Sequence, residues 1–170
     1  ATDLHQEKRR SCAVRAAKVA ELIAAEPADS WLIWCDTDYE ADALKKAIPG
    51  ALEIRGSQSP EQKERGILDF IDGRARVLIS KPRIFGHGLN LQHCARVAFV
   101  GVSYSFEQLY QCIRRCWRFG QTRPVHVHVV MAETEAAVWA AVNAKAVDHE
   151  EMILFMHAAT RRGVRSERRV

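Results

Sequence analysis

The chain has 170 residues, which is the size of one domain with a real core, and its apolar content is ordinary for a globular protein. It has no apolar run near the ~20 residues that cross a bilayer and no signal-peptide core at its start, and its five cysteines follow no secreted spacing. We therefore expect a cytoplasmic protein with no membrane partner. The net charge of +4 equals that of residues 161–170 alone, so the body is close to neutral and this basic tail is expected to be disordered.

Strands and helices are predicted to alternate along the chain. A helix rich in Ala, Lys, Arg and Glu comes first, and apolar runs, capping residues and Gly or Pro stops mark the rest. The predicted helices are Glu7–Ala25, Asp38–Ile48, one from Ser59 to about Asp72, one opening at Ser105, and a long or broken one from Glu133 to about His157. The predicted strands are Trp31–Cys35, Ala51–Ile54, Val77–Ser80, Val97–Val100 and Val125–Val130.

This alternation predicts an α/β fold, a mostly parallel sheet with helices on both faces. Ligands of such sheets bind at the carboxyl ends of the strands. Residues 35–36, 55–57, 80–81 and 101 fall at those ends. We divide the chain into a helical segment at 1–29, one domain at 30–158 and the tail at 159–170.

The most informative stretch is residues 111–121, Gln-Cys-Ile-Arg-Arg-Cys-Trp-Arg-Phe-Gly-Gln. If it is helical as far as Gly120, then Gln111, Arg115 and Arg118 share one face. Guanidinium groups suit phosphate oxygens and can stabilise a transferring phosphoryl group. The alternative is a solvated helix face. The pattern Q-x-x-x-R-x-x-R-x-G-Q resembles the last motif of superfamily-two helicases, and its end resembles the Swi/Snf branch of DNA translocases.

Two further segments resemble the second lobe of that family. The run Gly86-His-Gly-Leu-Asn-Leu-Gln92 resembles an element that contacts the DNA backbone and couples it to the nucleotide site, although residues 82–85 depart from the family pattern. The turn at 55–57 resembles a G-S/T turn near a DNA phosphate. Without the other motifs, both segments would be ordinary strand-to-helix turns. The DNA-contacting residues that the resemblance implies are Arg55, Gly56, Ser57, Ser80, Lys81, His87, Asn90 and Gln92.

The resemblance covers residues 30–132 and implies a RecA-like second lobe. In the complete enzyme, Arg115 and Arg118 would reach the γ-phosphate of ATP, which binds with Mg²⁺ between two lobes. The other residues implied at this cleft are Gln111, Gly120, Gln121, Gly86 and Gly88. The implied partners are double-stranded DNA and a first RecA-like lobe, in cis or in trans.

The chain lacks the sequence G-x-x-x-x-G-K-[ST] and lacks an apolar strand ending in Asp-Glu. We therefore expect no cofactor on this chain alone and no ATP hydrolysis by it. Two alternatives are a stand-alone nucleic-acid-binding regulatory module and a small α/β enzyme with an arginine-lined phosphate site.

Two minor features have simpler interpretations. Cys112 and Cys116 have a spacing that can bind zinc, but no C-x-x-C pair accompanies them, so we expect buried thiols and no metal site. Trp117 is expected to pack its helix onto the sheet.

Overall fold

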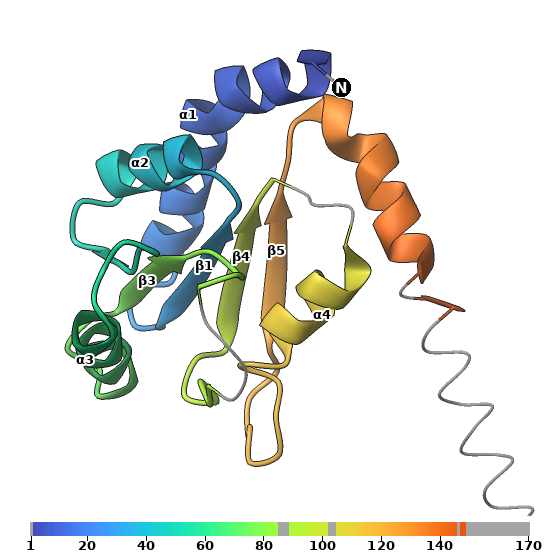
Figure 1. The fold of residues 1–170 in the computed structure, drawn as a ribbon. Helices are drawn as coiled ribbons and strands as arrows, with labels where there is room; N and C mark the ends of the chain where they lie inside the picture. Colours follow the sequence, from blue (N-terminus) through green and yellow to red (C-terminus); the bar gives the residue numbers. More distant parts are fainter. Residues whose placement is uncertain (1, 85–88, 102–104, 146, 149–170) are drawn as a thin grey trace, which may run out of the picture.

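The computed structural model describes residues 2–84, 89–101, 105–145 and 147–148. Its centre is a five-stranded sheet in the order β2-β3-β1-β4-β5, in which all paired strands are parallel (Figure 1). The predicted α/β class with a parallel sheet is confirmed. The strands are β1 (Trp31–Cys35), β2 (Leu52–Glu53), β3 (Val77–Ser80), β4 (Arg96–Val100) and β5 (His126–Val130).

The helices lie on both faces of this sheet (Figure 1). They are α1 (Thr2–Ala25), α2 (Asp38–Ala47), α3 (Pro60–Ile71) and α4 (Phe106–Ile113), followed by a 3-10 turn η1 (Glu133–Glu135) and helical residues 136–145. The predicted capping of α3 is present, because the Ser59 hydroxyl accepts from the Gln62 backbone N–H and Pro60 begins the helix. None of the helices in the described part of the chain is long and apolar enough to span a bilayer.

Strand β1 separates two apolar cores, and this explains why its five residues form an unbroken apolar run. Trp31, Ile33 and Cys35 join the core beneath α1 and α2. Leu32 and Trp34 point to the opposite face and join the core that contains Phe70, Leu91, Cys94, Cys112 and Cys116. Side chains alternate between faces along a strand, so both faces of β1 must be apolar.

The predicted helix through residues 111–120 is wrong in its length. Helix α4 ends at Ile113, and residues 114–120 form a series of turns. The backbone N–H groups of Arg115 and Cys116 bond three residues back, to the carbonyls of Cys112 and Ile113. The Arg115 carbonyl then accepts from Leu91 N–H at 2.9 Å. This long-range bond draws the chain off the helical path, so Gln111, Arg115 and Arg118 do not share a helix face.

The segment after β5 is partly described. The predicted helix begins as expected, with η1 running directly into helical residues 136–145. The remainder of that predicted helix and the predicted disordered tail at 159–170 lie outside the described residues.

Candidate functional site

The turn of residues 114–123 lies beside residues 89–94, and this contact brings two of the predicted motifs together. In Figure 1 the turn is the loop at the lower edge, between α4 and β5. The Arg118 guanidinium donates from Nη1 to the Leu89 carbonyl at 3.1 Å. The Leu91–Arg115 backbone bond lies in the same contact. The neighbouring segment therefore holds the guanidinium of Arg118 and the main chain of Arg115, which lie 29 and 24 residues further along the chain than their partners.

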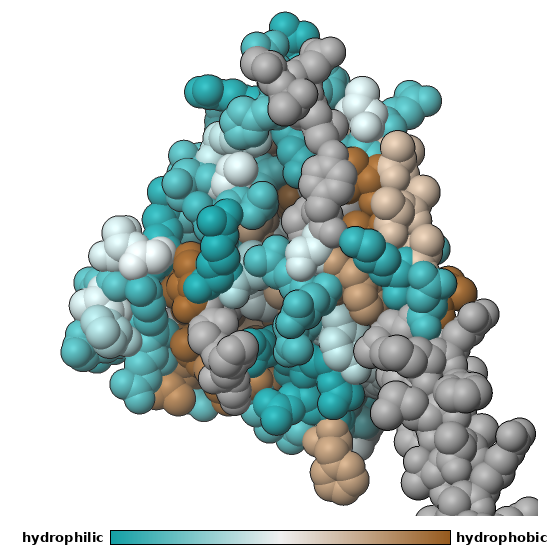
Figure 2. Space-filling view, turned by 45° about the vertical axis from the view of Figure 1, so that its right-hand side comes forward, coloured by the Kyte–Doolittle hydropathy of each residue, from teal (hydrophilic) through white to brown (hydrophobic). Residues whose placement is uncertain are grey.

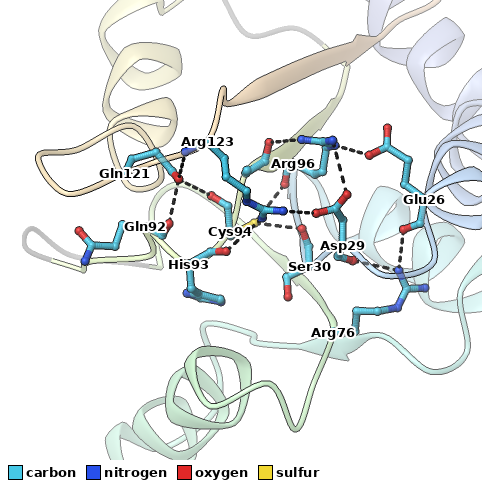
Figure 3. Close-up of polar contacts among 11 residues, drawn as sticks. Glu26, Asp29, Ser30, Arg76, Gln92, His93, Cys94, Arg96, Gln121 and Arg123 are labelled. Carbon is cyan, nitrogen blue, oxygen red and sulfur yellow. Dashed lines mark hydrogen bonds and ion pairs between the residues drawn. The ribbon is translucent and has the colours of Figure 1, made fainter.

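Gln121 fixes the end of this turn through its side chain (Figure 3). Its Nε2 donates to the carbonyls of Gln92 at 2.8 Å, Cys94 at 3.2 Å and Cys116 at 3.2 Å. Its Oε1 accepts from Arg123 N–H at 3.0 Å. The side-chain amide of Gln121 thus joins the segment of Gln92 and Cys94 to the turn at Cys116. The sequence predicted Gln121 at the nucleotide cleft, and the structure shows it bonded to backbone on both sides.

Gly120 is a residue whose conformation the turn requires. Its φ is +95°, and a Cβ built there would lie 3.0 Å from Gln92 Oε1. A side chain at this position would meet both backbone strain and a close contact. Gly120 and Gln121 together hold the turn against residues 92–94.

The prediction that Trp117 packs its helix onto the sheet is wrong. Its side chain is 53% exposed and does not pack α4 onto the sheet, because the chain leaves the helix before reaching it. The Arg114 guanidinium lies 5.4 Å from its ring centroid. Phe119, Gln111 and Arg118 are also exposed, while Arg115 is half-buried.

An ion-pair network that the sequence did not predict holds the far end of the turn (Figure 3). Arg123 Nη1 pairs with Asp29 Oδ1 at 2.6 Å, and Arg96 Nη2 contacts the same carboxylate at 3.4 Å. The bond from Arg123 lowers the pKa of Asp29 despite the opposing effect of desolvation. Arg96 also pairs with Glu26. No local pattern could reveal the Asp29–Arg123 pair, since 94 residues separate its members.

A second surface lies at the carboxyl ends of β1, β2 and β3. It is an open groove of about 820 Å³. Arg55, Gly56, Ser57 and Lys81 line it together, so the structure brings four of the predicted DNA-contacting residues to one surface. The other lining residues are His5, Asp36, Thr37, Asp38, Tyr39, Arg83 and Ile84.

The cations of this groove are paired with nearby carboxylates. Lys81 Nζ lies 2.6 Å from Asp38 Oδ1, and this bond lowers the pKa of Asp38. Arg83 Nη2 lies 3.3 Å from Asp36 Oδ1.

Arg55 is held in the same way, because it pairs with Asp42 and with Glu53, and these bonds raise the pKa of its guanidinium. Glu53 is largely buried, but Asp42, Asp38 and Asp36 are exposed, and exposed pairs of this kind contribute roughly 0–1 kcal/mol and can exchange partners. A phosphate can therefore compete for the cations of the groove.

The remaining predicted DNA-contacting residues lie elsewhere. Ser80 is buried, and its hydroxyl donates to the Ile54 carbonyl at 3.0 Å, so its side chain is used inside the sheet. Asn90 and Gln92 are exposed beside the turn, where Asn90 Oδ1 accepts from Gln92 N–H at 3.3 Å. Gly86, His87 and Gly88 lie outside the described residues.

Comparison with known proteins agrees with this arrangement. Residues 14–120 match the model of the helicase conserved C-terminal domain. The chain belongs to this family. The sequence-based identification as a second, RecA-like lobe of a superfamily-two helicase is confirmed. No curated protein matches the sequence.

Solved structures of helicase C-terminal lobes have the same fold. The C-terminal part of the Fun30 ATPase domain has a TM-score of 0.64 and 20% identity, over 74% of this chain and 43% of that one. The C-terminal domain of the DEAD-box protein Dbp5 has a TM-score of 0.65 and 18% identity, over 79% of each chain. An S. cerevisiae Dbp5 structure bound to Gle1 and IP6 gives 0.69 and 19%, over 81% of this chain and 37% of that one. At these identities the likeness supports the fold alone.

Three cysteines of this helicase lobe, Cys94, Cys112 and Cys116, are buried in the core on the α4 side of the sheet. Burial raises the pKa of the Cys112 thiol to about 12. Cys94 and Cys116 share a side-chain hydrogen bond, which lowers the pKa of the first and raises that of the second. Cys94 Sγ also lies 3.3 Å from the Ser30 carbonyl. These thiols therefore act as packing groups of the core.

Proposed function

We propose that this lobe is the second half of a Swi/Snf-type DNA-dependent ATPase that moves along double-stranded DNA in the cytoplasm or nucleoid. The observation that carries the proposal is the turn of residues 114–123. It presents Arg118 at the surface and Arg115 partly buried, next to the segment that ends in Asn90-Leu-Gln92. Arginines held by backbone contacts are preorganised to meet a developing negative charge.

In this proposal ATP and Mg²⁺ bind between this lobe and a first lobe that carries the phosphate-binding loop. The donor set of this chain suits one side of that cleft only. Arg115 and Arg118 supply guanidinium donors for the γ-phosphate, whereas the sequence has no P-loop lysine and no strand ending in Asp-Glu for the metal. ATP, when bound, supplies the phosphoryl group, and the two arginines stabilise its charge.

The groove at the carboxyl edge is the proposed DNA surface. Its lining offers the Arg55 and Lys81 cations, the Ser57 hydroxyl and the backbone of Gly56. Such groups contact phosphates, so binding is expected to be independent of base sequence and to weaken as salt rises. Ser80 is not included, because its hydroxyl is occupied inside the sheet.

The test is a comparison of DNA-stimulated ATP hydrolysis by the isolated chain and by the same chain joined to a P-loop lobe. We expect turnover only from the joined protein. DNA-dependent turnover by the rigorously purified isolated chain would contradict the half-enzyme proposal. Tight, salt-insensitive, sequence-selective DNA binding would favour the regulatory-module alternative.

A further inference from the structure

The first turns of α1 extend the groove beyond the predicted motifs. Figure 1 shows the N-terminal end of α1 above the carboxyl edge of the sheet. His5 lines the groove, and its ring meets the Tyr39 ring edge-on, with centroids 5.8 Å apart. The Arg9 guanidinium lies 5.9 Å from the centroid of the same Tyr39 ring. Residues of α1 and α2 therefore form one continuous rim of the groove.

Arg9, which borders the groove through Tyr39, differs from the lysine and arginine residues that line it. Lys81, Arg83 and Arg55 all pair with carboxylates. Among the described residues, the Arg9 guanidinium makes only the contact with Tyr39, and its side chain is exposed. A cation–π contact leaves the N–H donors of a guanidinium free to bind oxygen. Arg9 does not line the groove itself, but it lies against the lining residue Tyr39 and can bind a phosphate there without first leaving a carboxylate partner.

Helix α1 is also firmly held in this position. Arg15 Nη1 pairs with Glu40 Oε1 at 2.9 Å, and both side chains are buried. The cluster touches Gly101, where a Cβ would lie 2.7 Å from Arg15 Nη1. Ala16, Val19 and Ile23 anchor the rest of the helix in the core. The groove rim formed by α1 is therefore preorganised and pays little ordering entropy on binding.

We propose that the first turns of α1 are an additional wall of the DNA surface, in which Arg9, supported by Tyr39, binds a backbone phosphate and His5 borders the same site. The inference rests on the proposed function of the groove. It goes beyond the family resemblance, because the matched region begins at residue 14. It assigns a binding role to part of the predicted helical segment at residues 1–29, for which the sequence predicted no function.

The test is titration of a labelled, mixed-sequence DNA duplex with the full chain, followed by fluorescence anisotropy at several salt concentrations. We expect Arg9→Ala to weaken binding several-fold and to reduce the salt slope by about 1, as expected for one lost phosphate contact. Tyr39→Leu should weaken binding in the same direction, whereas Tyr39→Phe, which keeps the ring, should bind like the unmodified chain. Circular dichroism confirms that each variant is folded.

Lys18→Ala is the matched control. Lys18 is an exposed cation of the same helix, its side chain is 59% exposed, and its partner is Glu21. Lys18→Ala also removes one positive charge, but at a position outside the groove. Its effect on DNA affinity should therefore be much smaller than that of Arg9→Ala. Equal effects of the two variants would overturn the proposal. If Lys81→Ala weakens binding and Arg9→Ala does not, only the role of α1 fails. If neither does, the proposed DNA surface fails as well.

Discussion

The turn of residues 114–123 and the groove at the carboxyl edge hold their arginines and lysines in different ways. In the turn, side chains bond to backbone: Gln121 reaches three carbonyls and Arg118 reaches one. In the groove, side chains bond to exposed side chains, as in the Lys81–Asp38 pair. Backbone partners fix a geometry, whereas exposed ion pairs exchange readily. The first arrangement suits a group that must meet a transition state, and the second suits a surface that releases and rebinds phosphates.

The largest expected effect concerns the two arginines of the turn, whose positions are fixed by backbone partners. In a two-lobe protein, Arg118→Ala and Arg115→Ala should each lower kcat by about 10³-fold or more, the scale of a lost arginine finger. DNA affinity should change little. Steady-state ATPase assays with saturating DNA measure the first quantity, and anisotropy measures the second.

Arg114→Ala is the control for these variants. Arg114 is an exposed arginine of the same turn whose described contact is with the Trp117 ring. Its removal should leave kcat within a few-fold of the unmodified enzyme. Near-normal turnover in both the Arg115 and Arg118 variants would show that these residues are structural.

The second prediction concerns the amide that holds the turn. Gln121→Glu keeps the shape of the side chain but replaces the Nε2 donor with an acceptor, which faces three carbonyls. We expect the free energy of unfolding to fall by about 1–2 kcal/mol, since backbone acceptors lose their partner. Urea denaturation measures this change.

The exposed Gln111 of α4 provides the comparison. Gln111→Glu makes the same chemical change and should alter stability by less than about 0.5 kcal/mol. If the two variants are equally stable, the turn does not depend on Gln121, and the contrast with the groove disappears.

The third prediction concerns the ion pairs of the groove, which can exchange partners. Asp38→Asn removes the carboxylate that competes with DNA for Lys81, so it should raise DNA affinity several-fold at low salt. The gain should shrink as salt rises, because screening weakens both the pair and the phosphate contact. Asp72→Asn removes the same charge from a pair with Arg74 outside the groove lining and should have a much smaller effect. Unchanged affinity for Asp38→Asn would mean that Lys81 does not bind phosphate.

Sequence patterns predicted local structure well and long-range contacts poorly. The apolar run at 31–35 and the capping residues Ser59 and Gln62 defined their elements because both signals are local. The predicted helix through Arg118 was too long because its end depends on the bond between Leu91 and Arg115, which no nearby residue signals.

The same difference between local patterns and long-range contacts applies to the candidate site. The sequence chose Arg55 and Lys81 correctly as neighbours, since parallel strands bring their carboxyl ends to one edge. It did not reveal the carboxylates that hold them or the Arg9–Tyr39 contact, because these depend on how α1 and α2 pack. Their binding roles stay predictions.

The smallest expected effect is a pH dependence of the free energy of unfolding, which arises from His93 in the segment beside the turn. His93 packs edge-on against Phe70 with centroids 4.8 Å apart, and burial lowers the pKa of its imidazole below the usual 6.5. The folded state therefore favours neutral His93. Its contribution to stability is full above pH 6.5 and is lost as the pH falls through the folded-state pKa, because the unfolded chain then binds the proton more readily. The loss cannot exceed about 1.4 kcal/mol per pH unit.

His93→Gln should flatten the fall in unfolding free energy between neutral and mildly acidic pH, measured by urea denaturation at a series of pH values. His128 has a pKa lowered by burial in the same way, so His128→Gln should act additively. An unchanged pH profile in the double variant would show that acid sensitivity arises from other groups, and the burial of these two imidazoles would then not limit the stability of the lobe in acid.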